Sequence, residues 1–306
     1  MNKIKPILIF LVVFLLTSSA CSRAGFDKPI VKFQGASLVV IESSKTIFSE
    51  LNKVERDQYI LEKLRKREEI QLIELEKTQV FSREALKVRM DALEALKRYG
   101  ELLMEAAKSD SPTKIKAEAI NLGEAIKNLS SETSSLTGVD DGKFQSAVGP
   151  FATIIGSVLN LFIEGKIQDA LNKAINEGEK PINALIQVLR SDMQLAYQRR
   201  KTALGGMRVL FVQEYKKELD KGNMADAERL KLCADRVIEH EDRWEKLLLI
   251  QPESGLDAMA KAHSALVTYA NSKRKASDFA TLVESMEIFA SQALSIGQAI
   301  NELKNL

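Results

Sequence analysis

Apolar residues recur in steps of three and four along most of this chain, which is the spacing of one face of an α-helix. The pattern is cleanest in the last helix, which we predict to begin at Ser254. Its second half carries an unbroken apolar seam that must pack against another helix. The seam also makes residues 279–303 a candidate homo-oligomer interface, and it consists of Phe279, Leu282, Met286, Phe289, Ala293, Ile296, Ile300 and Leu303.

The same spacing predicts further helices, and helix-breaking residues mark where they end. Residues 37–109 contain no proline and are predicted to form one long helix, and residues 112–177 two helices joined by a loop. Gly178 to Pro181 interrupts the pattern, and residues 181–306 are predicted to form three more helices. Since strand signals are sparse, we predict an all-α fold: an elongated, mostly antiparallel helical bundle with coiled-coil-like long helices.

The N-terminal segment has a different pattern. It begins with Lys3 and Lys5, continues with an uncharged apolar run from Ile7 to Leu16, and ends in small residues before Cys21, in the sequence MNKIKPILIFLVVFLLTSSAC. This order is typical of an export signal, and the apolar run is shorter than the ~20 residues of a membrane-spanning helix. The segment resembles the signal of bacterial lipoproteins. That resemblance implies that residues 1–20 are removed and that Cys21 is acylated, typically with palmitate.

The resemblance also implies a location in the cell envelope. Ser22, not Asp, follows the cysteine, which in Gram-negative lipoproteins is similar to the class anchored in the outer membrane and facing the periplasm. Two alternatives are an ordinary secreted protein, since Ser18 and Ala20 suit that cleavage, and a retained membrane anchor. Residues 21–36 show no sustained period, so we predict a lipidated tether there, followed by a helical body over residues 37–306.

The charge balance limits the classes of partner. Without residues 1–20 the chain keeps 44 − 2 = 42 basic residues against 42 acidic ones, so its formal net charge is zero. A nucleic-acid-binding protein would show a basic excess, so we predict no nucleic-acid partner. The run Lys273–Arg274–Lys275 could contact phosphate or lipid headgroups, although a solvated helix face is the simpler interpretation.

A second uncharged segment, Phe144–Ile163, is long enough to cross a membrane. We predict a buried helix at the centre of the bundle, because Gly149, Ser157 and Asn160 make the segment less apolar than a typical membrane span. A constitutive span or a partner-docking patch is a further interpretation. The candidate core or membrane-contact residues of this segment are Phe151, Ile154, Ile155, Val158, Leu159 and Phe162.

Conditional membrane insertion of Phe144–Ile163 is the main alternative. Gly149, Thr153 and Ser157 repeat every fourth residue, which permits close helix packing in lipid. Long amphipathic helices around one apolar segment loosely resemble the arrangement of α-helical pore-forming toxins. That resemblance covers the arrangement alone and implies a membrane-remodelling or pore-forming protein.

No motif in the chain indicates catalysis. His240 lies among acidic residues, but a zinc site needs three or four protein ligands, so we predict neither a metal nor another cofactor. His263 lies on an apolar stripe, and Cys233 in a helical pattern, so both are predicted to be core residues. Hydrolase, metalloprotease, nucleotide-loop and CxxC motifs are lacking in the sequence. We therefore predict a non-enzymatic lipoprotein that acts as a structural, scaffold or adaptor protein through contacts with another protein.

Overall fold

The computed structural model describes residues 26–109, 111–135, 141–224 and 226–304. These residues form helices and turns without any strand, which confirms the predicted all-α fold. A 3-10 helix at Gly222–Met224 precedes α8. The α-helices are α2 (Asp27–Lys66), α3 (Leu72–Lys77), α4 (Arg83–Lys108), α5 (Pro112–Ser135), α6 (Asp141–Ile163), α7 (Ile167–Leu219), α8 (Ala227–Leu248), α9 (Glu253–Ala270) and α10 (Ala276–Lys304).

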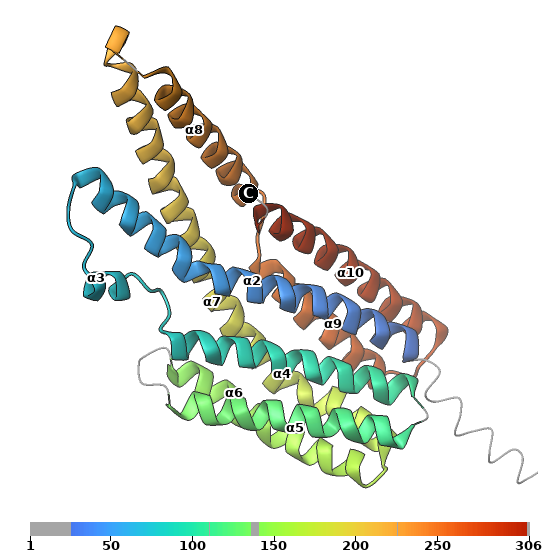
Figure 1. Ribbon diagram of the computed structural model, residues 1–306. Helices are drawn as coiled ribbons and strands as arrows, with labels where there is room; N and C mark the ends of the chain where they lie inside the picture. Colours follow the sequence, from blue (N-terminus) through green and yellow to red (C-terminus); the bar gives the residue numbers. More distant parts are fainter. Residues whose placement is uncertain (1–25, 110, 136–140, 225, 305–306) are drawn as a thin grey trace, which may run out of the picture.

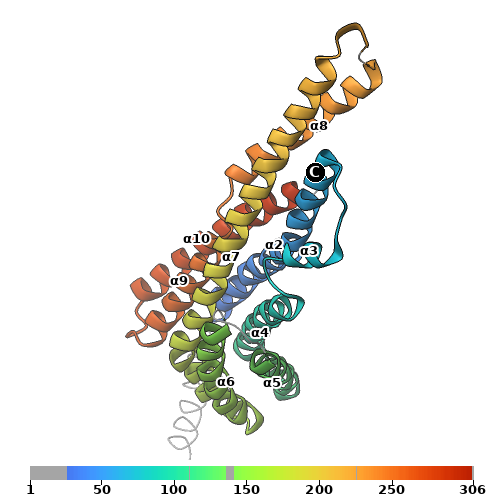
Figure 2. The same cartoon turned by 90° about the vertical axis from the view of Figure 1, so that its left-hand side faces the viewer.

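The long helix α7 connects the parts of this elongated bundle (Figure 1). Its 53 residues extend about 80 Å at 1.5 Å per residue, and it contacts α2, α4, α6, α8 and α9. The α7–α8 hairpin projects beyond the rest of the molecule (Figure 2). We call the end formed by this hairpin and the α2–α3 connection the distal end, and the opposite end, where α2 begins, the proximal end.

The predicted tether over residues 21–36 is wrong from Phe26 onward. Helix α2 begins at Asp27, and Phe26, Ile30 and Phe33 are buried in the core. These three residues step by four and three, so they form one helical face that the sequence interpretation missed. Residues 21–25 lie outside the described part of the chain, and so does the predicted signal peptide.

The single long helix predicted over residues 37–109 is also wrong. Helix α2 ends at Lys66, the next residue, Arg67, has a left-handed φ of 57°, and α4 folds back alongside α2. The Asn52 amide donates to the Phe81 carbonyl at 2.9 Å, and its oxygen accepts from the Val80 N–H at 3.0 Å. The charged residues around Arg67 offer no apolar face, whereas folding back lets α2 and α4 bury each other's faces.

Two further helix boundaries differ from the prediction. The chain breaks at Gly165, with a φ of 78°, and α7 then runs through Pro181. A proline inside a helix costs ~3 kcal/mol, but Gly178, Pro181 and Ile182 are all buried in the bundle, which offsets that cost. The last predicted helix is two helices, α9 and α10, which fold back on each other around the turn at residues 271–275.

The C-terminal seam is buried within the chain. Leu282, Met286, Phe289, Ala293 and Ile300 are at most 3% exposed, and α10 packs on α2 and α9. The seam is therefore part of the monomer core and offers no free face to a second copy in this conformation.

A buried polar pair lies where α4, α7 and α9 meet. The Tyr99 hydroxyl lies 2.8 Å from Nε2 of His263 and donates to the Ala174 carbonyl at 3.2 Å. The hydroxyl has one proton and donates it to the Ala174 carbonyl, so its oxygen accepts a hydrogen bond from the N–H at Nε2 of His263. The other ring nitrogen, Nδ1, then carries no proton and is an acceptor without a partner. Burial keeps the imidazole neutral and lowers the pKa of His263 to about 4, in line with the predicted core role.

We expect His263 to make the folded protein sensitive to acid. Its pKa is near 6.5 in an unfolded chain and about 4 in the fold, so the unfolded chain binds the proton more readily between these values. Its contribution to the free energy of unfolding is complete above pH ~6.5 and falls by about 3 kcal/mol on acidification to pH ~4. Urea denaturation of the wild type and His263→Gln across this range should show that difference. Parallel stability curves for the two proteins would contradict it.

Candidate functional site

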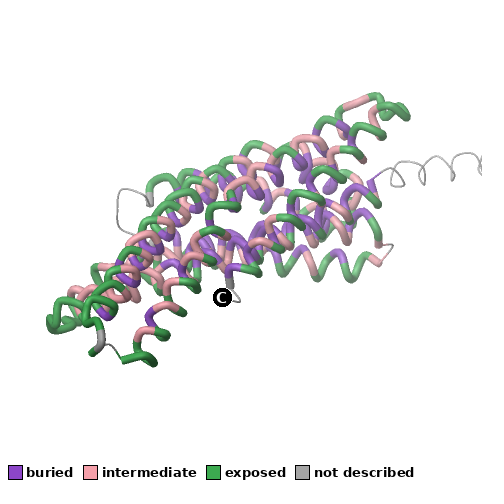
Figure 3. Tube along the Cα trace, turned by 90° about the horizontal axis from the view of Figure 1, so that it is seen from above, coloured by how far each residue is buried: buried purple, intermediate pink, exposed green. Residues whose placement is uncertain are grey.

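The predicted membrane-contact or core residues lie on α6, between α5 and α7. Their burial follows the helix period, with the apolar side chains turned into the bundle. Figure 3 shows buried residues along the inside of the bundle and mostly exposed ones at its distal end. Phe151, Ile155 and Val158 are 0% exposed and Phe162 3%, whereas Ile154 and Leu159 are half-buried against the core.

Beyond Lys143, the outward side of α6 is uncharged but not strongly apolar. It carries Gly149, Pro150, Thr153, Gly156 and Asn160. Among the described helices, this is the one long and apolar enough to cross a membrane by length and composition, with a hydropathy of 1.7 over Gly142–Ile163. The core helix of a soluble protein passes the same test. Most large side chains of α6 pack inside the bundle, so in this conformation its outward face, apart from Ile163, consists of small or polar residues.

A buried arginine holds the start of α6 against α4 and α7. The Arg89 guanidinium lies over the Phe81 ring at 3.7 Å and near the Phe144 ring at 5.1 Å. It also forms an ion pair with Asp192 at 2.9 Å and donates to the Ala85 carbonyl at 2.7 Å. Removing one partner of a buried pair leaves an uncompensated charge, so this cluster resists displacement of α6.

The other candidate chemical groups lie on α8. The His240 ring stacks on Phe211 with ring centres 4.4 Å apart, and burial, with Arg243 nearby, lowers the pKa of His240. Cys233 is buried and forms no disulfide with any described residue. Across residues 26–304, apart from the few positions not described, no three His, Cys, Asp or Glu side chains are grouped to hold a metal ion.

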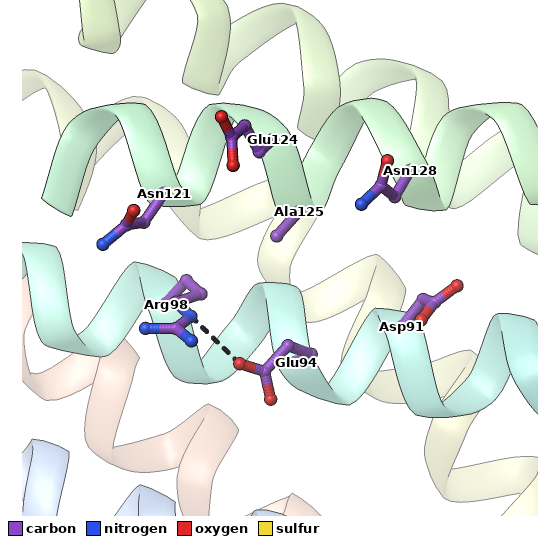
Figure 4. A pocket seen from close by; sticks show the side chains of 7 residues that line it. All are labelled: Asp91, Glu94, Arg98, Asn121, Glu124, Ala125 and Asn128. Carbon is purple, nitrogen blue, oxygen red and sulfur yellow. Dashed lines mark ion pairs between the residues drawn. The ribbon is translucent and has the colours of Figure 1, made fainter. Parts of the chain in front are cut away.

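A small polar hollow lies between α4 and α5, with a volume of about 260 Å³ (Figure 4). Its walls carry amides and charged groups, including Arg98, whose Nε lies 2.9 Å from Glu94 Oε1. No serine, cysteine or histidine lines it, so it lacks a nucleophile next to a base. The lining residues are Asp91, Glu94, Arg98, Asn121, Glu124, Ala125 and Asn128.

The distal end carries several strongly exposed apolar side chains. We call residues 64–77 the α2–α3 arm, and none of the residues in α3 is buried. Four of the arm's large apolar side chains face solvent, namely Leu64 at 68%, Ile70 at 48%, Leu72 at 69% and Ile73 at 68% exposed. Clusters of exposed apolar side chains of this kind mark interaction sites in soluble proteins.

A groove of about 920 Å³ separates the end of α2 from the α7–α8 hairpin. Leu64 and Leu232 line it from opposite sides, together with charged residues of both signs. Glu218 is buried in its wall and is paired with Lys221 at 2.6 Å and Arg229 at 3.2 Å. The groove and the α2–α3 arm together form what we call the distal surface, which suits a partner segment with mixed apolar and charged groups.

Sequence reasoning did not find the distal surface. The sequence did contain one signal: three apolar residues follow a charged run and do not continue the apolar face of α2. They are Ile70, Leu72 and Ile73. Apolar residues that fit no helical face are candidates for contact with another molecule.

No family model, curated protein or solved structure matches this chain, so its function is inferred from its own residues and geometry.

We expect Ile155→Asp to unfold the protein or to destabilise it by more than about 4 kcal/mol, because an unpaired charge would enter the core. The matched control is Thr153→Asp, an exposed position on the same helix, which should change stability by less than ~0.5 kcal/mol. Thermal unfolding and liposome flotation should be measured on the same samples. A normally stable Ile155→Asp protein that no longer floats would favour the membrane-inserting alternative.

Proposed function

We propose that this protein is an envelope lipoprotein that acts as a tethered adaptor or scaffold. The acyl chains on Cys21 hold the proximal end at the membrane, and the distal surface binds another protein. The observation that carries the proposal is the position of the exposed apolar side chains. Leu64, Leu72 and Ile73 are exposed and belong to the end of α2 and to α3, and Figure 1 shows these elements at the opposite end of the bundle from the start of α2.

The geometry of the bundle supports a spacer role. Helix α7 alone extends about 80 Å, from the proximal end to the tip of the hairpin with α8. A partner bound at the distal surface would therefore be held well clear of the lipid headgroups. The hollow between α4 and α5 also offers no nucleophile next to a base.

We expect acylation at Cys21, because a short positive start and an apolar run precede this cysteine. Mass spectrometry of the native protein should find a lipid-modified Cys21 at the mature N-terminus. Cys21→Ser should leave an uncleaved precursor or release a soluble protein from the membrane fraction. An unmodified Cys21 at the amino terminus would contradict the anchor.

We expect a photo-crosslinking amino acid at Leu64 to capture a protein partner in intact cells. Leu72→Asp with Ile73→Asp should abolish that capture, since charge would replace the apolar contact, and stability should change by less than ~0.5 kcal/mol because both residues are exposed. The control places the same changes on α10, at Ile288 and Leu294, which are 53% and 57% exposed. Equal capture by the two double variants would reject the distal surface as the binding site.

A further inference from the structure

The α9–α10 turn lies directly beside the point where the described chain begins. The Phe26 ring packs edge-on against Tyr269, with centres 5.1 Å apart, and the Arg274 guanidinium lies 5.4 Å from the centre of the same ring. Five chain steps separate Phe26 from Cys21, and an extended chain covers at most ~3.6 Å per residue. A lipid on Cys21 therefore holds Phe26 within about 18 Å of the attachment point, and the turn packs against Phe26.

The connection between α4 and α5 lies at the same end. Helices α2 and α4 run antiparallel, since Asn52 bonds to Phe81 and Gln34 lies against Gly100. This register brings Lys28, at the start of α2, level with Lys108, at the end of α4. Figure 1 shows the α9–α10 turn and the α4–α5 connection close to the start of α2.

These segments give the proximal end a local positive charge. Among the described residues, the basic side chains here are exposed and none lies within ion-pairing distance of a carboxylate. The acidic groups of these segments are fewer than the basic ones: Asp27 is half-buried, Asp278 accepts a hydrogen bond from the Lys275 N–H at 3.0 Å, and Asp110 follows Lys108 by two residues in the sequence. We define the proximal basic face as Lys28, Lys108, Lys114, Lys273, Arg274 and Lys275.

The rest of the proximal end carries less net positive charge, because its basic side chains include some that are paired with carboxylates. In the α6–α7 turn, Glu164 is paired with Lys166 at 2.8 Å, and on α7 Lys173 lies 3.7 Å from Glu177. Since residues 21–306 carry a formal net charge of zero, a membrane would not attract the whole molecule. Any attraction must come from a local cluster close to the bilayer, because salt screens charges beyond about 8 Å.

We propose that the proximal basic face binds the headgroups of anionic phospholipids. This inference rests on the proposed anchor at Cys21, which brings the face to the membrane. A single lipid attachment combined with a basic surface is a common two-signal arrangement for stable membrane binding. The contact orients the bundle, with the α9–α10 turn on the membrane and the distal surface directed away from it. The run Lys273–Arg274–Lys275 thereby gains a role that a solvated helix face does not have.

The test uses the native acylated protein reconstituted in vesicles of phosphatidylcholine, with or without phosphatidylglycerol. An amine-reactive reagent labels lysines, and mass spectrometry gives a rate for each. An anionic surface near −30 mV concentrates protons beside it about threefold, so labelling of Lys273 and Lys275 should slow about threefold. Lys217 and Lys231, exposed at the distal end, should react equally in both vesicles. Salt at ~1 M should remove the difference.

Two charge-reversal variants complete the test. Lys273→Glu with Lys275→Glu should restore the labelling of Lys114 to its rate in phosphatidylcholine, whereas Lys217→Glu with Lys231→Glu should not. Slow labelling of the proximal basic face in both kinds of vesicle would show proximity without headgroup binding and would overturn the inference. Equal labelling rates for the proximal and distal lysines in both kinds of vesicle would overturn it too. The N-terminal peptide in the same spectra reports acylation separately. An unmodified Cys21 rejects the anchor and this inference together, while a modified Cys21 with unchanged lysine rates rejects only the inference.

Discussion

The packing of the first half of α2 into the core is the interaction on which the rest of the structure depends. Phe33 is fully buried, and its ring lies 6.1 Å from the His263 ring and 5.8 Å from the Phe289 ring. Helix α2 thereby joins α9 and α10 to α4 and α7, and it brings the beginning of the chain next to its C-terminal helices. The same packing places the start of α2 beside the α9–α10 turn, so it decides which end of the bundle a lipid on Cys21 would hold.

The two ends of the molecule differ in what stabilises them. Beyond Leu51, no residue of α2 is buried, and α8 buries only Cys233, His240 and Leu247. The distal contacts are mainly polar, such as Arg65 Nη1 donating to Gln213 Oε1 at 2.7 Å. Exposed polar pairs contribute little to stability, so the distal end should open more readily than the core. An interaction surface on such a segment can adjust to a partner while the core keeps its packing.

Much of the core could be predicted from the periodicity of the sequence, and much of the distal surface could not. The residues of α6 that were predicted to act as a group do lie on one helix, and four of them are buried. At Gly205 the helices α7 and α8 approach closely, since a Cβ there would lie 3.4 Å from the Trp244 ring. The exposed residues Leu72 and Ile73 gave no comparable signal, because the two residues form no periodic face.

The sequence by itself determined what depends on neighbouring residues. Helical periodicity reports the face that each helix must bury, and the N-terminal pattern expected of an export signal is linear, so both expectations can be formed without the fold. Only the tertiary structure decided where the long helical runs turn. Arg67 and Gly165 end helices, while Pro181 does not, because burial against distant helices outweighs the local preference. The fold also decided that Lys273 lies in a turn beside Phe26, since their proximity comes from contacts between opposite ends of the chain.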